Sequence, residues 1–442
     1  MRDIFHLLNP FHPFTKVDNI ENNPSSQKDK SKGENDAKFQ ASENLSLMNP
    51  TKVDSSSYFD TASLLNPMHP TLWLEHTEPP QRYLGPSTAS YNAALGRVGH
   101  VYHTLIHRAF ASRFRSLHAE EESSSDVKCK GKVVVGGGSG FVGKEVCSLL
   151  RRKGYDVIIV SRNKFDSRVV TWDDIKLQGL PEKTLAVVNL AGQNMLDPLK
   201  RWNNSFKELV RESRIQTAKS LKDAIVNRHK AGLDVPNVFV QITGVGLYPP
   251  GNNDVEYDEY SQIEGDAGGY MSRLVKDWEY AATLPQDVPT RNVFLRSGVV
   301  LGRNGGMIQQ IFLPFYFGGG GRMGSGMQNM PWIHVKDVSG MILHAIENEN
   351  VKGPLNASAP QIINNQSFVD AFASALHRPA FIPLPEFVWN IVFGEERAAI
   401  ITKGVTVIPK RTEEAGYKFK YPDIKTACEE FSFFFYEDSN VE

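Results

Sequence analysis

Cysteine, net charge and long apolar runs are all scarce in this sequence. The three cysteines, Cys129, Cys147 and Cys428, lie far apart. This sparse, odd set suits a reducing compartment and argues against a zinc site, so no metal is expected. The 49 Lys and Arg residues nearly balance the 50 Asp and Glu residues, so no global field favours nucleic acid. No window holds the ~18 consecutive apolar residues that a membrane span requires.

The first 126 residues differ from the rest of a chain that is long enough for two or three domains. Asp18 to Ser46 is polar and poor in apolar residues, so it cannot offset chain entropy and is predicted to be disordered. Short phrases recur around it, at residues 8–13, 48–50 and 65–70 and at 15–18 and 51–54. The unit is too short for a solenoid. We interpret it as duplicated linker, with a docking phrase as the alternative.

An amphipathic basic helix is predicted near residues 90–117, within this low-complexity extension. Apolar residues from Tyr91 to Ala109 recur every three or four positions, and no acidic residue occurs from Pro79 to Ala119. Three interpretations stay open: a helix packed on the body, a helix that contacts a membrane surface or a protein partner, and an organelle-targeting segment. The last favours a mitochondrial localisation, with the cytoplasm as the alternative.

A glycine-rich turn between a strand and a helix is the most informative motif. Val133 to Val135 is a β-branched run, and residues 141–150 follow an amphipathic helical pattern. Between them the spacing is Gly137-x-x-Gly140-x-x-Gly143. Such glycines let the backbone approach a dinucleotide pyrophosphate, and the helix start offers it free N–H groups. The residues predicted to bind the cofactor here are Gly137, Ser139, Gly140, Phe141, Val142 and Gly143.

The residues after the next strand indicate which nucleotide is bound. An apolar strand is predicted at residues 155–160, and it is followed by Ser161 and Arg162. An NAD site usually carries Asp or Glu at this point, to accept a hydrogen bond from the ribose 2′-hydroxyl. A guanidinium pairs with the 2′-phosphate of NADP instead. We therefore predict NADP(H), with a turn-capping Ser161 and a solvated Arg162 as the alternative.

Strands and helices alternate along the rest of the chain. The predicted elements after residue 160 are strands at 185–190, 237–242 and 293–296 and helices at 202–226 and 270–282. This order predicts an α/β fold with a Rossmann-type, doubly wound parallel sheet. Ligands of such sheets lie at the carboxyl ends of the strands. Here those ends carry Ser161, residues 189–192, residues 243–246 and residues 296–298.

Two hydroxyls are candidates for catalysis at these strand ends. Thr243 and Tyr248 follow one core strand, and a reductase needs a polarising hydroxyl and a proton donor near the nicotinamide. The Tyr-x-x-x-Lys arrangement that usually lowers a phenol pKa is missing from the helix that starts at Tyr270. The single occurrence, from Tyr421 to Lys425, lies outside the nucleotide half and is interpreted as chance.

Other polar residues are more ambiguous. Arg214 and Arg296 are candidates for contact with a phosphate or a carboxylate substrate, or for solvated positions. The glycine-rich stretch at residues 317–326 predicts a flexible loop with nothing to hold it rigid. We expect this loop to border the substrate pocket, with a second phosphate cradle as the alternative. His334 is either catalytic or, as is more usual for a lone His among apolar residues, a structural hydrogen-bonding group.

Several phrases resemble one family closely. They are VVVGGGSGFVG, VIIVSRN, VVNLAGQN, RWNNSFKELVRESR, LRSGVVLG, PWIHVKDV and GPLNASAP. Together they resemble the epimerase family proteins among the atypical extended short-chain dehydrogenases/reductases. The tail from His377 to Pro422 resembles a small C-terminal domain restricted to that group. The resemblance covers residues 132–431 and leaves the N-terminal extension out.

The resemblance implies particular site residues. It implies NADP(H) on a Rossmann domain at residues 131–350 and a C-terminal α/β substrate-side domain at 351–434. It places Ser161 and Arg162 at the adenine ribose phosphate. The other cofactor residues that it implies are Leu190, Ala191, Arg214 and Val300, and its catalytic hydroxyl corresponds to Thr243. Because the Tyr-Lys pair has no counterpart here, the resemblance does not establish a reaction.

Two functions are therefore expected. The first is an NADP(H)-dependent oxidoreductase or epimerase that acts on a small substrate, with Thr243 polarising the substrate oxygen and Tyr248 donating a proton. The second is a cofactor-holding scaffold or redox sensor that acts through protein partners. The missing Tyr-Lys pair and the N-terminal extension support the second.

Overall fold

A computed structural model describes residues 129–432, apart from 165, 196–199, 266, 304, 384, 386–389 and 391–394. The predicted extension at 1–126, with its helix near 90–117, lies outside the described residues. No helix within the described part is both long and apolar enough to cross a membrane.

A seven-stranded, fully parallel sheet forms the centre of this part of the chain. Its order is β10-β7-β5-β4-β1-β2-β3. The strands are β1 Gly131–Gly136, β2 Tyr155–Ser161, β3 Val169–Thr171, β4 Thr184–Asn189, β5 Val238–Gly244, β7 Arg291–Ser297 and β10 Gly353–Ala357. The chain runs outward from β1 to β3 and then returns to β4 on the other side of β1. The predicted Rossmann-type fold is confirmed, and its topological switch point lies between β1 and β4.

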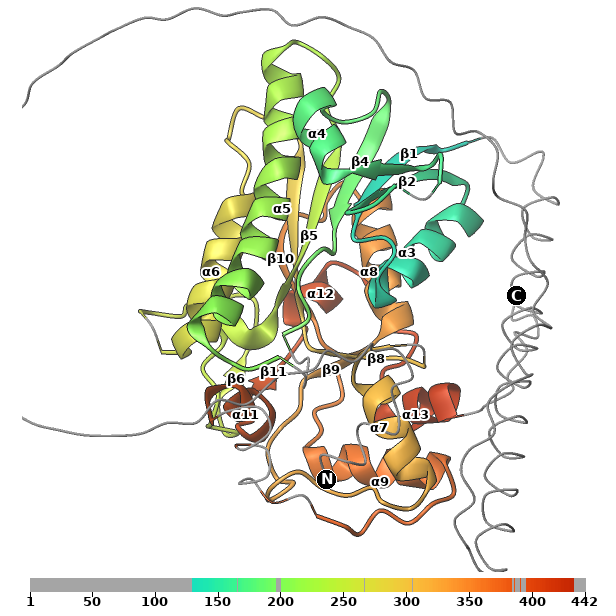
Figure 1. The fold of residues 1–442 in the computed structure, drawn as a ribbon, viewed down its shortest axis with the longest axis vertical. Coiled ribbons are helices and arrows are strands. Elements are labelled where there is room, and N and C mark those ends of the chain that lie inside the picture. Colours follow the sequence, from blue (N-terminus) through green and yellow to red (C-terminus); the bar gives the residue numbers. More distant parts are fainter. Residues whose placement is uncertain are drawn as a thin grey trace, which may run out of the picture. The chain divides into compact units, whose positions relative to one another are not determined.

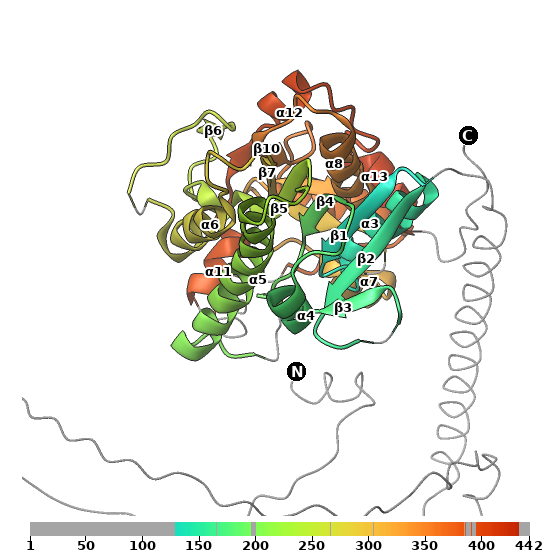
Figure 2. The ribbon, with the colours of Figure 1, turned by 90° about the horizontal axis from the view of Figure 1, so that it is seen from above.

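Helices cover both faces of this sheet (Figures 1 and 2). One face is covered by α3 Phe141–Arg152 and α8 Val335–Glu347, and the other by α4 Trp172–Gln178, α5 Asn204–Lys230 and α6 Gly269–Ala282. Val133 and Val135 belong to the core under α3 and α8, whereas Val134 belongs to the core under α5 and α6. This is the alternation of side chains along a strand. Fully burying each of these valines stabilises the fold by about 1.5–3 kcal/mol.

A second core lies beyond the carboxyl edge of the sheet. The short pair β8 Val299–Leu301 and β9 Trp332–His334 leads into it. Its helices are α7 Gly306–Tyr316, α9 Asn365–Ala375 and α13 Ile424–Ser432. Trp332, Phe372 and Phe431 are fully buried there. The molecule thus builds a separate apolar cluster on the side where the strands end.

The remaining short elements join this region to the sheet. They are η1 Val245–Leu247, β6 Glu256–Tyr257, α11 Glu395–Thr402, β11 Thr406–Val407 and α12 Lys410–Glu414. After β10 the described chain is mainly helical, and its strand β11 pairs only with β6. Strand β10 itself is an edge strand of the main sheet, although it follows residue 350. The division into domains at 131–350 and 351–434 stays a prediction.

Candidate functional site

The glycine turn between β1 and α3 is a close contact of backbone with backbone. A Cβ on Gly143 would lie 2.2 Å from the carbonyl oxygen of Gly137. Gly137 has a φ of +76°, and a Cβ there would lie 2.9 Å from the amide nitrogen of Ala191. A side chain at either position therefore collides with backbone that cannot move aside. The two glycines let α3 start directly above the end of the sheet.

The first turn of α3 presents its N-terminus at this edge. Gly140 is the N-cap residue, and Lys144 N–H donates to its carbonyl oxygen at 2.9 Å. The first turn contains no acidic residue and Gly140 offers no side chain, so the leading N–H groups and the positive dipole end suit an anion. Ser139 is exposed, and Phe141 and Val142 are half-buried. The ring of Phe141 contacts Gly305, so it packs against the loop after β8.

Ser161 and Arg162 lie beside the same turn. Gly137 N–H donates to the carbonyl oxygen of Val160 at 3.0 Å, which brings the end of β2 against the glycines. Ser161 ends β2 and is half-buried, and Arg162 is exposed. Within the described part of the chain, the Arg162 guanidinium forms no hydrogen bond or ion pair, so it is available to an added anion.

The end of β4 forms the other wall of the turn. Leu190 N–H donates to the carbonyl oxygen of Gly136 at 2.8 Å, and Ala191 N–H donates to Asn189 Oδ1 at 3.1 Å. Asn189 is fully buried and donates from Nδ2 to Gln241 Oε1 at 2.9 Å. Leu190 and Ala191 thus lie against Gly137, and a buried amide pair holds them there. Their role as cofactor-binding residues stays a prediction.

Arg214 is a half-buried cation on α5 without an acidic partner among the described residues. Its Nη1 donates to the carbonyl oxygens of Gln193 and Val210, both at 3.0 Å. The guanidinium carbon lies 5.0 Å from the centroid of the Trp278 ring. Burial lowers the pKa of Arg214 to about 10. A cation in such surroundings is stabilised by an anionic ligand. The cofactor role of Arg214 stays a prediction.

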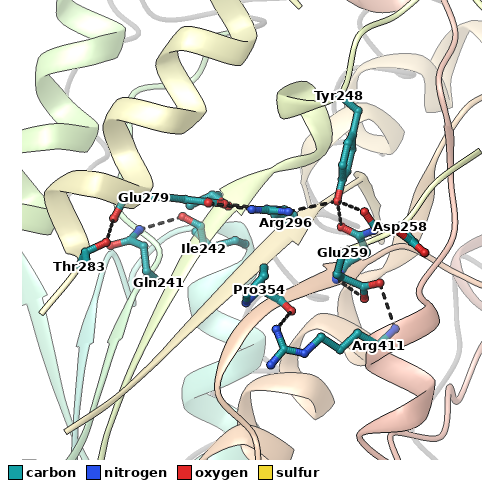
Figure 3. A network of polar contacts seen from close by, with 12 residues as sticks. Gln241, Ile242, Tyr248, Asp258, Glu259, Glu279, Thr283, Arg296, Pro354 and Arg411 are labelled. Carbon is teal, nitrogen blue, oxygen red and sulfur yellow. Dashed lines mark hydrogen bonds and ion pairs between the residues drawn. The ribbon is translucent and has the colours of Figure 1, made fainter. Parts of the chain in front are cut away.

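Thr243 and Arg296 are paired neighbours on β5 and β7, and α6 covers both. Thr243 is 5% exposed, and its hydroxyl bonds to Glu279 Oε1 at 3.1 Å. Arg296 binds the same carboxylate, with Nε to Oε1 at 2.8 Å and Nη2 to Oε2 at 2.9 Å. Arg296 was a candidate for a substrate carboxylate, but the carboxylate that it contacts is that of Glu279. Figure 3 shows the contact of Glu279 with Arg296 and its continuation to Tyr248.

Tyr248 lies deep in this network. It is 1% exposed, and its hydroxyl bonds to Asn356 Oδ1 at 2.8 Å and to the carbonyl oxygen of Asp258 at 3.0 Å. Arg296 Nη1 donates to the same hydroxyl at 3.3 Å. Burial raises the pKa of the Tyr248 phenol. This geometry suits a fixed phenol that anchors Arg296. The assignment of Tyr248 as a proton donor stays a prediction.

The start of α6 holds no Tyr-Lys couple. Tyr270 donates its hydroxyl proton to the carbonyl oxygen of Lys207 at 2.8 Å. Lys276 donates instead to the carbonyl oxygens of Ile263 and Gly265, at 3.1 and 2.6 Å. Each group thus donates to a backbone carbonyl oxygen, so the two do not form the Tyr-Lys pair that is usual in dehydrogenases.

Val300 and His334 belong to the β8–β9 pair. Val300 is half-buried, and its carbonyl oxygen lies 3.0 Å from where a Cβ of Gly306 would be, next to Phe141. His334 is fully buried, with Nδ1 accepting from Lys336 N–H at 3.1 Å and Nε2 lying 3.1 Å from Glu430 Oε2. Both ring nitrogens of His334 are satisfied, so the structural alternative fits it.

The glycine-rich loop at residues 317–326 is held in place. Met323 N–H donates to Asn365 Oδ1 at 2.8 Å, and Met323 also accepts from Gln328 Nε2 at 2.9 Å. Gly320 accepts from Ile382 N–H at 3.1 Å. The expectation that nothing holds this loop is wrong, because side-chain amides from the following segments replace regular secondary structure there.

Sequence reasoning missed Glu279 and Trp278, which touch Thr243 or Arg214 from α6. Both lie on a helix that the pattern predicts, but helical periodicity says only that they share an element. One feature of the sequence could have indicated such a contact, namely the charge of Arg296 at a strand end. A buried guanidinium requires a nearby acceptor.

Comparison with known proteins identifies the family that the sequence phrases resemble. The profile of the NAD dependent epimerase/dehydratase family matches residues 133–358, and a domain of unknown function, DUF1731, matches residues 384–431. Epimerase family protein SDR39U1 of Bos taurus is 45% identical over 300 residues, which are 68% of this chain and 99% of that protein. Epimerase family protein YfhF of Bacillus subtilis is 30% identical over 302 residues, which are 67% and 96% of the two chains.

A solved structure extends the comparison. The crystal structure of human epimerase family protein SDR39U1 (isoform2) with NADPH has a TM-score of 0.65 and 44% sequence identity. The match covers 68% of this chain and 99% of that chain. With its parallel sheet, its glycine turn and a C-terminal DUF1731 segment, this chain belongs to the NAD dependent epimerase/dehydratase family, as an atypical extended short-chain dehydrogenase/reductase.

Proposed function

We propose that this chain is an NADP(H)-dependent oxidoreductase or epimerase of a small organic substrate. The observation that carries the proposal is the site between β1 and β4. There two sterically required glycines, a helix N-terminus and two cations without acidic partners in the described chain converge. The human relative at 44% identity, whose crystal structure contains NADPH, supports the same cofactor.

The residues present fit this cofactor. The backbone from Gly137 to Gly143 would receive the pyrophosphate, since only glycine at either end lets the turn fold this tightly against the neighbouring backbone. Arg162 would bind the 2′-phosphate with Ser161, and Arg214 would meet a further anionic part of the nucleotide. Leu190, Ala191 and Val300 would line its apolar parts.

Side-chain hydroxyl groups of the chain would act on the substrate beside the cofactor. When bound, NADP(H) supplies or accepts a hydride at the nicotinamide C4. Thr243 is the hydroxyl that we place beside the reacting oxygen, because β5 ends one residue later at the carboxyl edge of the sheet. The proposed role of Tyr248 as proton donor requires its hydroxyl to leave Asn356.

Cofactor choice is tested by titrating the full chain with NADPH and NADH. Arg162→Ala removes one or two charge-assisted hydrogen bonds, so NADPH affinity should fall about tenfold or more while NADH affinity stays nearly constant. Lys153→Ala, at the other end of α3, is the matched control and should change neither affinity. Equal losses for both nucleotides would contradict the role of Arg162, and no binding of either would remove the whole proposal.

Turnover is tested by NADPH oxidation against a panel of carbonyl compounds. We expect Tyr248→Phe to lower turnover if the phenol supplies the proton. Equal turnover in wild type and variant would eliminate it as the donor and leave it as the anchor of Arg296.

A scaffold or redox sensor is the second candidate function. The hydrogen bonds of Tyr270 and Lys276 to backbone carbonyl oxygens support it, because the two side chains do not form a Tyr-Lys pair for proton transfer. This function predicts nucleotide binding without turnover, together with capture of a protein or a membrane surface by the segment 1–126. A pull-down with that segment that recovers no partner, combined with turnover by the body, would exclude it.

A further inference from the structure

The hydroxyl of Thr243 is held by a buried ion pair. The side chain of Arg296 is 11% exposed and that of Glu279 is 16% exposed. Both nitrogen-to-oxygen contacts between them are shorter than 3 Å, in a two-point fork. Burial lowers the pKa of Arg296, but the hydrogen bonds and charge of Glu279 outweigh burial and raise it. A guanidinium fork that donates to both oxygens is the geometry of pairing with a carboxylate.

The direction of the Thr243 hydrogen bond follows from this charge. An ionised carboxylate has no proton and can only accept. The hydroxyl of Thr243, 3.1 Å from Glu279 Oε1, must therefore donate its single proton to it. Thr243 Oγ1 is left with lone pairs alone for any further partner.

The network beyond Arg296 keeps the carboxylate in place. Arg296 Nη1 bonds to the hydroxyl of Tyr248 (Figure 3), and this hydroxyl bonds in turn to Asn356 Oδ1. Asn356 N–H donates to Glu259 Oε1 at 2.8 Å. On the helix side, the Thr283 hydroxyl donates to the backbone carbonyl oxygen of Glu279 at 2.8 Å. Rotation of Glu279 away from Thr243 would leave a buried guanidinium without its counter-charge, which is strongly unfavourable.

We propose that Glu279 is a positioning residue that fixes Thr243 as a hydrogen-bond acceptor, so that the site prefers an alcohol to the carbonyl compound of the same skeleton. The proposal rests on the proposed function, which places Thr243 beside the reacting oxygen. An alcohol hydroxyl donates to the free lone pairs of Thr243. A carbonyl oxygen in the same place brings one acceptor against another, because the proton of Thr243 is already used.

The test compares two probes on the full chain loaded with a redox-inert tetrahydro analogue of NADPH. Cyclohexanol and cyclohexanone differ chiefly in hydrogen-bond polarity, and their dissociation constants are measured by calorimetry. Wild type should bind the alcohol about tenfold tighter, which corresponds to one hydrogen bond. Equal affinities, a preference for the ketone, or binding of neither probe would overturn the proposal.

Variants separate the effect of the Thr243 hydrogen-bond direction from the effect of a disturbed fold. The double variant Glu279→Gln with Arg296→Met leaves no buried charge unpaired, and its amide can donate to Thr243 Oγ1, so the alcohol preference should vanish or reverse. Thr243→Val should lose the preference and Thr243→Ser should keep it. Asp277→Asn is the matched control on the same helix. It removes the negative charge that Arg211 contacts at 3.0 and 2.9 Å, without touching Thr243, and it should keep the wild-type ratio.

A second measurement needs neither nucleotide nor probe. In mixed light and heavy water, a slowly exchanging hydroxyl splits the Cβ resonance of its threonine by an isotope shift. The nucleotide-free wild type should show two lines for Thr243, and the double variant should show one. A single line in folded wild type would overturn the positioning by Glu279.

The two proposals fail in different ways. Nucleotide binding without an alcohol preference would refute this inference and leave the cofactor proposal standing. Two lines for Thr243 without any nucleotide binding would refute the proposed function, and the substrate class with it, while the positioning of Thr243 by Glu279 would stand.

Discussion

At the residue scale, the glycines show that the absence of a side chain can be a specific requirement. A Cβ on Gly143 would lie 2.2 Å from Gly137 O and 2.7 Å from Gly138 Cα. At Gly140, three residues earlier, a Cβ would meet only Gly137 O, at 3.3 Å. The same motif thus contains one glycine that packing demands and one that a small shift can replace.

Gly143→Ala is therefore predicted to be damaging although alanine is the better helix former by about 1 kcal/mol. The methyl group must push α3 away from the turn, so we expect a lower melting temperature and a loss of NADPH affinity of about tenfold or more. Thermal unfolding and fluorescence titration measure both. Gly140→Ala serves as the control, with a clearly smaller effect. Equal behaviour of the two variants would show that the turn is not tightly packed.

At the element scale, buried acceptors join the C-terminal helices to the sheet. Glu259 is 6% exposed and lies at the start of α12. Its Oε1 accepts from Asn356 N–H and Thr412 N–H at 2.8 and 3.1 Å, and its Oε2 accepts from Arg411 N–H at 3.0 Å. One carboxylate thus caps α12 and ties it to β10.

Glu259→Gln tests this connection. An amide nitrogen at either oxygen position faces N–H donors, so we expect the variant to lose about 1–3 kcal/mol for each buried donor left unsatisfied. Chemical denaturation of the full chain measures the loss. Glu414→Gln is the control, because its carboxylate accepts from Tyr260 at the surface, and it should change stability by less than about 0.5 kcal/mol. A Glu259→Gln variant as stable as the control would refute the cap.

At the scale of the whole molecule, one carboxylate couples folding to pH. Glu430 on α13 accepts from Lys336 Nζ at 2.8 Å and lies 3.1 Å from His334 Nε2. Because Nδ1 of His334 already accepts from Lys336 N–H, the ring proton is on Nε2 and points to Glu430. Burial raises the pKa of Glu430, but the hydrogen bonds from His334 and Lys336 outweigh it and lower the pKa to about 2.

Acid should therefore destabilise the fold through Glu430. A carboxyl group whose pKa is lower when folded stabilises the protein above its unfolded value of 4.5 and loses that contribution as the pH falls to about 2. The loss amounts to about 3 kcal/mol. Glu430→Gln should be less stable near neutral pH and less sensitive between pH 4.5 and 2. Urea denaturation across this range measures both, with exposed Glu429→Gln as the control. Parallel curves for Glu430→Gln and wild type would contradict the assignment.

The predicted site falls into two groups at this scale. The placement of Gly137, Gly143 and Arg162 around one turn could be predicted from the sequence, because they lie within one βαβ unit, where local spacing sets the geometry. The contacts among Arg296, Tyr248 and Glu279 could not be predicted, because these residues lie on elements that are far apart in the chain.

The sequence by itself determined the alternation of strands and helices and the glycine turn, and it carries the prediction of NADP(H), because these depend on short-range periodicity and on residues next to one another in the chain. Only the tertiary structure decided what Thr243 can offer a ligand. The register between β5 and β7 places Thr243 beside Arg296, 53 positions further along, and α6 brings a carboxylate over both. The position of a single proton then follows from a charge that is distant in sequence and adjacent in space.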